Sequence, residues 1–214
     1  MKQKIVVVDY GMGNTHSVVK ALEYVADDQT EILLTSEPET VQKADRIVFP
    51  GQGAAKDCMR ELKTRGLDQA ILETAQQKPF LGICMGLQVL MTHSEENGGI
   101  ECLDLYPGEV RHFGEVTEKA ERLKIPHMGW NNIFQTRPHP LWKNIPDNSR
   151  FYFVHSYYVD PEDAALTVGD CDYGRNFTAA VAHDNVFALQ CHPEKSAQAG
   201  LQLLTNFINW EGKE

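Results

Sequence analysis

Apolar residues in the first half of the chain fall into short runs, separated by longer segments with helical spacing. Four runs rich in β-branched and aliphatic residues predict strands at Lys4–Val8, Glu31–Leu34, Arg46–Phe49 and Phe80–Ile83. The segments that follow three of these runs predict helices over 14–25, over 59–72 with a break at Gly66, and over Met85–Met91. Alternation of strands and helices favours a parallel sheet with helices on both faces.

The second half has a different pattern, with short strand-like runs between turns. These runs are Glu109–Phe113, Asn132–Gln135, Phe151–Val154, Thr178–Val181 and Val186–Cys191. We interpret them as antiparallel strands added to the central sheet. The proline-containing segment Thr136–Ser149 is predicted to be a loop, and Ser196–Trp210 a closing helix. Residues 1–214 are therefore predicted to form a single α/β domain with an open, mostly parallel sheet.

Charge and cysteine content narrow the classes of partner and compartment. Thirty acidic residues against twenty basic ones give a formal charge of −10, which argues against nucleic-acid and anionic-membrane partners. Five cysteines without a C-x-x-C pair predict reduced thiols in a reducing compartment. The N-terminal apolar run is too short for a signal peptide, and the uncharged stretch Pro79–His93 is interrupted by glycines. We expect a cytoplasmic protein.

The histidines show no metal-type spacing, and the chain has neither a G-x-G-x-x-G nor a Walker-type loop. These patterns predict that the protein uses no metal and no other cofactor. The chemistry is therefore expected to reside in its own side chains.

One cysteine lies where a predicted strand turns into a predicted helix. The segment Gly82-Ile83-Cys84-Met85-Gly86 is the cysteine version of the G-x-S-x-G nucleophile elbow, in which small neighbours permit a sharp turn. A helix N-terminus also favours a thiolate over a thiol. Taken alone, the segment is about as consistent with a core cysteine on a glycine-rich strand end.

A second motif, Gln190-Cys191-His192-Pro193-Glu194, follows the last predicted strand. Pro193 disfavours a helical conformation at the residue before it, and in an extended chain residues two apart point the same way. The Glu194 carboxylate can then orient the His192 imidazole. An isolated H-P-E is more typical of a surface turn, but both motifs end strands of one predicted sheet. Together they predict a Cys84–His192–Glu194 triad.

A third motif, Pro50-Gly51-Gln52-Gly53, ends another predicted strand. Acyl transfer through a tetrahedral intermediate requires amide donors directed at the oxyanion. We expect one donor at Met85 and a second from Gln52 or Gly53, since glycine allows the backbone to approach closely. In isolation this segment is more typical of a turn without a catalytic role.

The three motifs, in this order, resemble the class I glutamine amidotransferases, which use a cysteine–histidine–glutamate triad. Two further segments, Tyr10–Asn14 and Pro126–Asn131, resemble the branch of that family that serves imidazole glycerol phosphate synthases. Phe153–Tyr157 fits the same branch, and the resemblance extends over essentially the whole chain. One departure is Cys191, where the family usually has an aromatic residue.

The resemblance implies hydrolysis of L-glutamine through a glutamyl thioester, with ammonia delivered to a separate cyclase subunit in a heterodimer. That partner resembles a (β/α)₈ barrel and makes imidazole glycerol phosphate and aminoimidazole carboxamide ribotide in histidine biosynthesis. The residues implied to contact the substrate glutamine are Gly51, Gln88, Glu96, Ser156 and Tyr157. Asn14 and Lys195 are implied at the partner interface. A solvated acid remains the alternative for Glu96, and a solvated lysine for Lys195.

Two other functions stay open at this point. One is a paralogous amidotransferase subunit that serves another synthase, and the other is a catalytically idle regulatory scaffold. An intact triad disfavours the scaffold. For an active enzyme, we further expect that the isolated subunit is nearly silent, and that partner binding reorients the Gly51–Gln52 peptide to complete the oxyanion hole.

Overall fold

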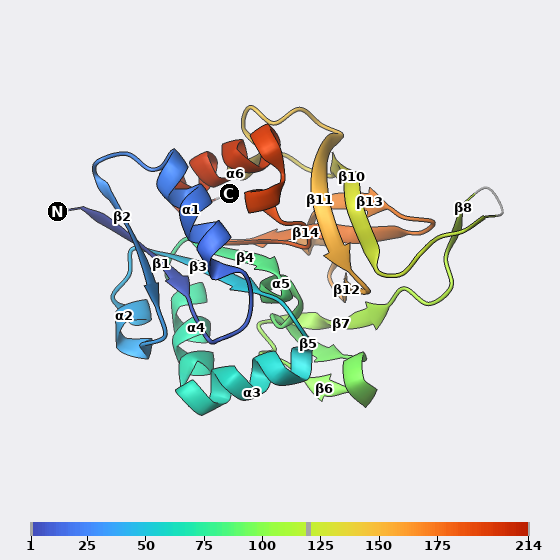
Figure 1. Cartoon of the computed structure of the whole chain (residues 1–214), viewed down its shortest axis with the longest axis horizontal. Coiled ribbons are helices and arrows are strands. Elements are labelled where there is room, and N and C mark those ends of the chain that lie inside the picture. Colours follow the sequence, from blue (N-terminus) through green and yellow to red (C-terminus); the bar gives the residue numbers. More distant parts are fainter. Residues whose placement is uncertain (1, 119–120, 214) are drawn as a thin grey trace.

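The computed structural model describes residues 2–118 and 121–213, and a large mixed β-sheet runs through the middle of the molecule (Figure 1). Its first five strands are parallel, in the spatial order β2-β1-β3-β4-β15. They are β1 (Gln3–Val8), β2 (Thr30–Thr35), β3 (Arg46–Gly51), β4 (Phe80–Cys84) and β15 (Val186–Leu189). The four parallel strands expected in the first half of the chain are confirmed.

Helices cover both faces of this parallel region, as expected (Figure 1). One face carries α1 (Thr15–Val25) and α6 (Ala197–Asn209), and the other carries α2 (Pro38–Gln42), α3 (Ala55–Arg65) and α4 (Leu67–Ala75). The helices α3 and α4 meet at Gly66, whose left-handed backbone (φ 67°) ends the first helix, so the expected break is confirmed.

Strand β1 shows why the sheet is buried on both faces. Successive side chains of a strand point to opposite faces. Ile5 and Val7 therefore pack into the core under α1 and α6, while Val6 and Val8 pack into the core against α3 and α4. A continuous β-branched run therefore supplies apolar side chains to the cores on both faces of the sheet.

The C-terminal half extends the sheet with mostly antiparallel strands, as expected. Beyond β15 the order is β14-β12-β7-β5-β6, and β13, β10 and β11 pair on from β14. Their bounds are β5 (Met91–Ser94), β6 (Ile100–Glu101), β7 (Tyr106–His112), β10 (His127–Gln135), β11 (Ser149–His155), β12 (Tyr157–Pro161), β13 (Thr167–Asp172) and β14 (Asn176–His183). The strands β12 and β13 were not predicted.

Short elements complete the described chain. They are β8 (Thr117–Glu118), β9 (Glu121–Arg122) and the 3₁₀ turns η1 (Glu96–Gly98), η2 (Pro140–Trp142), η3 (Ala164–Leu166) and η4 (Pro193–Lys195). The expected loop over 136–149 contains the η2 turn, and the last predicted strand ends two residues early, at Leu189.

The helix predicted over Met85–Met91 is wrong. Only the single turn α5 (Met85–Gln88) forms, and Met91 begins strand β5, which pairs with β7. Every residue from 85 to 91 is buried, so the segment has no solvent-facing side to sustain an amphipathic helix. The carbonyl oxygens from Val89 to Met91 instead accept from the backbone N–H groups of residues 103–106, which lead into β7.

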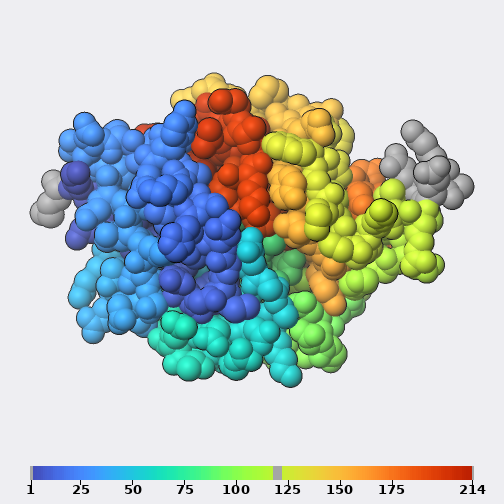
Figure 2. All heavy atoms as spheres, in the orientation of Figure 1, coloured from blue at the N-terminus to red at the C-terminus, as the bar shows by residue number. Residues whose placement is uncertain are grey.

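The carboxyl ends of β3, β4 and β15 lie at one edge of the sheet. Gly51 is the register partner of Cys84 across β3 and β4, and Ile83 is the partner of Leu189 across β4 and β15. The three predicted motifs are thereby brought together. Segments from distant parts of the sequence, coloured blue, cyan, orange and red, also meet in the middle of the face shown in Figure 2.

Candidate active site

Cys84 lies at a sharp turn between β4 and α5. Its backbone is in an unusual region (φ 56°, ψ −107°) that a non-glycine residue rarely adopts. A Cβ at Gly86 would overlap the carbonyl oxygen of Phe49, and a Cβ at Gly82 would lie 2.7 Å from the Cβ of Ala188. Both glycines are thus required by close packing, and the elbow geometry expected from the sequence is present.

His192 and Glu194 form a buried pair beside this turn. The Nδ1 atom of His192 lies 2.9 Å from Oε1 of Glu194, and both side chains are almost fully buried. Since a carboxylate can only accept, Nδ1 carries the proton and Nε2 is left to exchange one. No hydrogen bond of ordinary geometry satisfies Nε2 within the described residues.

The electrostatic surroundings favour an imidazolium at His192. Burial lowers the pKa of this imidazole. The neighbouring Cys84 sulfur and the Glu194 carboxylate raise it by more than burial lowers it, so the pKa of His192 is raised to about 10. The Cys84 sulfur therefore lies near enough to His192 to influence the pKa of its imidazole. The two residues also line the same cavity.

That cavity, of about 430 Å³, gathers most of the predicted site residues. Its walls are formed by Gln52, Gly53, Cys84, Met85, Gln88, Glu96, Pro126, Val154, His155, Ser156, Tyr157, His192 and Lys195. The volume is in the range of small-molecule sites. Gly51, Glu194 and Asn14 lie instead around a small adjoining pocket, which Gln52 and His192 share with the cavity.

The predicted oxyanion loop is held from behind. Any side chain at Gly51 would collide with the hydroxyl of Tyr10, so this strand end packs directly on the core. The thiol of Cys58 donates to the carbonyl oxygen of Gln52 at 3.6 Å, which fixes the peptide that carries the Gly53 N–H. Gly53 itself has φ 94°, where glycine is favoured. Which N–H in this loop donates to an oxyanion stays a prediction, as does the role of Met85.

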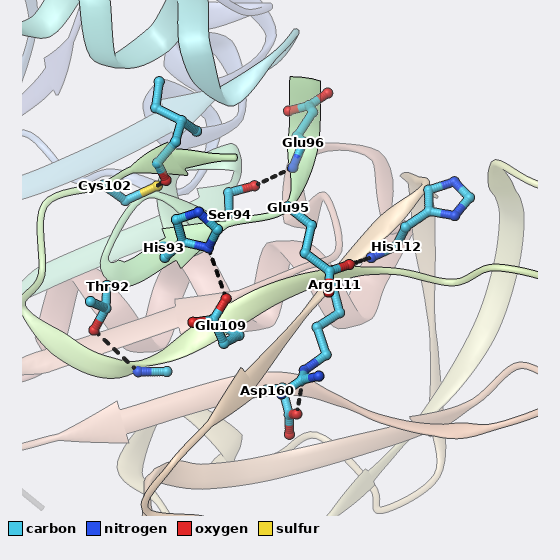
Figure 3. Close-up of polar contacts among 12 residues, drawn as sticks. Thr92, His93, Ser94, Glu95, Glu96, Cys102, Glu109, Arg111, His112 and Asp160 are labelled. Atoms are coloured by element: carbon cyan, nitrogen blue, oxygen red, sulfur yellow. Dashed lines mark hydrogen bonds and ion pairs between the residues drawn. The ribbon is translucent and has the colours of Figure 1, made fainter. Parts of the chain in front are cut away.

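Glu95 and Glu96 have different environments, and Figure 3 shows the contact of the Glu95 carboxylate with His112. The carboxylate of Glu95 accepts from the backbone N–H of His112 at 3.0 Å, whereas that of Glu96 accepts from the N–H of Ala55 at 2.6 Å. Ala55 begins α3, so Glu96 also complements that helix N-terminus. Glu96 is half-buried at the cavity wall. This position disfavours the alternative in which Glu96 is only a solvated surface acid.

The two predicted interface residues are both exposed. Asn14 caps α1, its Oδ1 accepting from Ser17 N at 3.3 Å, so it has a structural role as well. Lys195 borders the cavity, with Nζ 5.9 Å from the centre of the Tyr152 ring. Their contact with a partner stays a prediction.

Sequence reasoning missed Gln190 and His155 as site residues. Gln190 is fully buried and its Nε2 lies 3.6 Å from the sulfur of Cys84, while His155 lines the cavity. Gln190 stands two residues before His192 in a motif that was recognised, and this adjacency was the available signal. The same signal was available for His155, which stands directly before Ser156 in the segment Phe153–Tyr157.

Within residues 2–118 and 121–213, no helix is long and apolar enough to cross a membrane. In the same residues, no group of three or more histidine, cysteine or acidic side chains could hold a metal ion. All five cysteines are free thiols.

A comparison with protein families identifies the family of the chain. The model of the family "Glutamine amidotransferase class-I" matches residues 6–210. The chain belongs to the class I glutamine amidotransferases. The resemblance inferred from the sequence motifs is thereby confirmed, together with the α/β fold class.

Several relatives of this amidotransferase match over almost its whole length. It is 56% identical to the "imidazole glycerol phosphate synthase subunit HisH" of Hydrogenovibrio crunogenus, with 99% of each chain covered. The subunit of the same name from Pseudomonas putida is 53% identical, again over 99% of each chain. "HisH 1" from Pseudomonas aeruginosa is 51% identical over 100% of both chains.

Solved structures share the fold at much lower identity. The structure of PurLQS from Thermotoga maritima has a TM-score of 0.72 at 19% identity, covering 98% of this chain and 99% of that one. The glutaminase domain of CTPS from Trypanosoma brucei, solved with bound acivicin, has a TM-score of 0.61 at 16% identity, covering 98% of this chain and 95% of that one.

The close packing at the elbow predicts that one methyl group added at Gly86 greatly lowers the free energy of unfolding. Gly86→Ala forces a side chain against the Phe49 carbonyl and should destabilise the amidotransferase by about 2–4 kcal/mol, measured by urea unfolding. Gly66→Ala is the control, since nothing lies within 4 Å of its added Cβ and only backbone strain of about 1 kcal/mol is expected. Equal losses in the two variants would contradict the packing argument.

The coupling of sulfur and imidazole predicts a pH effect. Removing the sulfur in Cys84→Ala should lower the pKa of His192 from about 10, as measured by NMR titration of the imidazole. Since the folded pKa lies above the usual 6.5, this group stabilises the fold fully below pH 6.5 and loses that contribution as pH rises to about 10. In Cys84→Ala the loss should be complete at lower pH. An unchanged His192 pKa would show that the two groups are not coupled.

Proposed function

We propose that this class I glutamine amidotransferase is the glutaminase subunit of an imidazole glycerol phosphate synthase. The observation that carries the proposal is the buried Cys84–His192–Glu194 group at the wall of a cavity of about 430 Å³. The specific synthase is supported by full-length relatives of that name at 51–56% identity. The reducing cytoplasm suits an enzyme whose five cysteines are free.

The reaction begins with attack by the Cys84 thiolate on the side-chain carboxamide carbon of glutamine. The carbonyl electrons move to oxygen, and N–H groups of Met85 and the Gln52–Gly53 loop stabilise the oxyanion. His192 then gives a proton to the departing nitrogen as the C–N bond breaks. Ammonia leaves, and a glutamyl thioester remains on Cys84.

In the second half of the reaction His192 acts as a base instead of an acid. Neutral His192 takes a proton from water, whose oxygen attacks the thioester carbon, and the C–S bond breaks to release glutamate and the thiolate. Glu194 keeps the imidazole in one tautomer throughout, since its Oε1 accepts from Nδ1. A raised His192 pKa suits the first half, because the proton needed by the leaving nitrogen is already present.

The cavity offers complementary groups for free glutamine. Glu96 can pair with the substrate ammonium through the oxygen that is not taken by Ala55, while Gln88, Ser156 and Tyr157 line the same space. Burial and the nearby charges of Glu96 and Glu95 raise the pKa of the Tyr157 hydroxyl, so it remains a neutral donor. Gly51 is the register partner of Cys84 and lies in the small adjoining pocket, so its contact with glutamine remains the least supported of the set.

A separate cyclase subunit is proposed as the acceptor of the ammonia. A β10 face with unusual apolar exposure is available to it, with Met128, Trp130 and Phe134 exposed by 62, 44 and 45%. These residues alternate along one strand and border a surface groove, and Trp and Met are enriched in interfaces. Asn14 and Lys195 would extend the contact towards the active site.

Partner binding is also proposed to switch the glutaminase on. The Cys58 contact holds the Gln52–Gly53 peptide, whereas the preceding Gly51–Gln52 peptide has no side chain at Gly51 to restrain it. Reorientation of that peptide on partner binding would turn the Gln52 N–H to the oxyanion. An isolated subunit then wastes little glutamine.

The proposed function predicts a selective loss in Cys84→Ala. In the reconstituted pair of subunits, glutamine-dependent synthesis of imidazole glycerol phosphate should fall by at least about 10³-fold, because the covalent step is lost. Synthesis from added ammonium salt should persist, since the cyclase is intact. Retained glutamine-dependent synthesis would refute the triad and favour the idle scaffold, whereas no synthesis by the wild-type pair would favour a paralogue.

The exposed apolar face of β10 predicts that Trp130 contributes much of the binding free energy at the partner interface. Trp130→Ala should weaken binding to the cyclase by at least about tenfold, measured by calorimetry, because buried tryptophans often dominate such interfaces. Tyr24→Ala is the matched control: this residue is 77% exposed on α1, outside the β10 face, and should leave the affinity unchanged. Equal affinities for Trp130→Ala and wild type would remove this face from the interface.

A further inference from the structure

A buried side-chain amide lies against the sulfur of the proposed nucleophile. Gln190 follows β15, is fully buried, and places Nε2 3.6 Å from Sγ of Cys84, within hydrogen-bonding distance for sulfur. Its backbone N–H donates to the carbonyl oxygen of Ala179 at 2.8 Å, which fixes the residue to β14. The mechanism above assigns Gln190 no role.

The neighbours of Gln190 determine which end of its amide faces the sulfur. The carbonyl oxygen of Tyr157 can only accept, so the nitrogen of the Gln88 side chain, at 3.1 Å, must face it. The second hydrogen of that nitrogen is directed at Gln190, whose Oε1 lies 3.0 Å away. The amide nitrogen of Gln190 is then left for Cys84.

Two buried histidines support the same carbonyl. Nδ1 of His155 lies 2.8 Å from the Tyr157 oxygen and must carry a proton, so its Nε2 accepts from Nδ1 of His127 at 2.9 Å. Burial lowers the pKa of His155 to about 3 and that of His127 to about 4. Both imidazoles are neutral near pH 7, and the donor order that fixes Gln88 and Gln190 does not change there.

Several other ionisable groups lie around the Cys84 sulfur. They are Glu194 from η4, Cys191 and His192 just before η4, Tyr10 after β1, Cys58 from α3, and Glu96, Tyr157 and Lys195 at the cavity wall. Burial raises the pKa of Tyr10, Cys58 and Cys191, which keeps all three neutral near pH 7. The charges near the sulfur are thus those of His192, Glu194, Glu96 and Lys195, and Gln190 adds an uncharged donor.

We propose that Gln190 is a positioning residue for the glutaminase reaction, whose amide N–H holds the Cys84 sulfur and stabilises its thiolate. The bond is strongest before attack and again when the thiolate leaves the thioester, because hydrogen bonds to charged acceptors exceed those to neutral ones. No atom is transferred through Gln190. This inference rests on the proposed function, since it assumes that Cys84 is the nucleophile.

The test compares two substitutions that differ in what they present to the sulfur. Gln190→Met has a similar length but no donor, and Gln190→Glu replaces the donor by an oxygen that repels a thiolate. The rate of Cys84 alkylation by iodoacetamide is followed against pH in the full chain, with the modified peptide identified by mass spectrometry. The midpoint should rise in Gln190→Met and rise further in Gln190→Glu.

Steady-state kinetics of the complex with the cyclase provide a second readout. In both variants kcat for glutamine should fall by about 10–100-fold. In Gln190→Glu, which keeps an acceptor for Gln88, KM should change by less than about threefold, because the sulfur rather than the binding site is affected. Asn206→Leu is the control for loss of an inward-directed amide. Its Nδ2 donates to the carbonyl oxygens of Leu141 and Lys143, remote from Cys84, so stability should fall with an unchanged alkylation midpoint.

A measurement on the wild-type chain covers the case in which the variants do not fold. The side-chain NH₂ resonance of Gln190 should shift as Cys84 titrates and should stay constant over the same pH range in Cys84→Ala. Unchanged alkylation midpoints, or a Gln190 resonance insensitive to Cys84, would overturn the proposal. Glutaminase activity that survives Cys84→Ala would instead overturn the proposed function, so the two failures are distinguishable.

Discussion

The site depends on one constraint, the reversal of the backbone at the end of β4. Cys84 can adopt its strained conformation because Gly82 and Gly86 remove the side chains that would strike Ala188 and Phe49. That turn places the sulfur at the start of a helical turn and opposite Gly51 of the neighbouring strand. Strain of this kind costs about 1–3 kcal/mol, and it persists only where close packing on all sides opposes relaxation.

Burial sets the chemistry of the groups that meet there. The same desolvation that lowers the pKa of His155 and His127 also acts on His192, but only His192 has a sulfur and a carboxylate beside it to reverse the effect. The fold thus separates one charged imidazole from two neutral ones within a single region. The neutral pair orders a hydrogen-bond network, and the charged one is suited to proton transfer.

Much of this arrangement could be predicted from local sequence. The parallel strands were recognisable because short runs of β-branched and aliphatic residues alternate with helical segments, and the elbow because glycines flank Cys84 at fixed spacing. The helix over Met85–Met91 was predicted wrongly, since uniform burial leaves no periodicity that separates a helix from a strand. Strands β12 and β13, and the role of Gln190, depend on pairings between distant segments that local patterns do not encode.

The most direct test of the account is chemical trapping of the covalent intermediate. Acid quenching of the complex during glutamine turnover, followed by peptide mass spectrometry, should find a glutamyl group on Cys84 alone. The adduct should be absent from Cys84→Ala, which lacks the sulfur, and should form far more slowly when His192 is replaced by alanine, because His192 supplies the proton for the departing nitrogen. A glutamyl group on another residue, or steady turnover by a chain that lacks Cys84, would contradict the central claim.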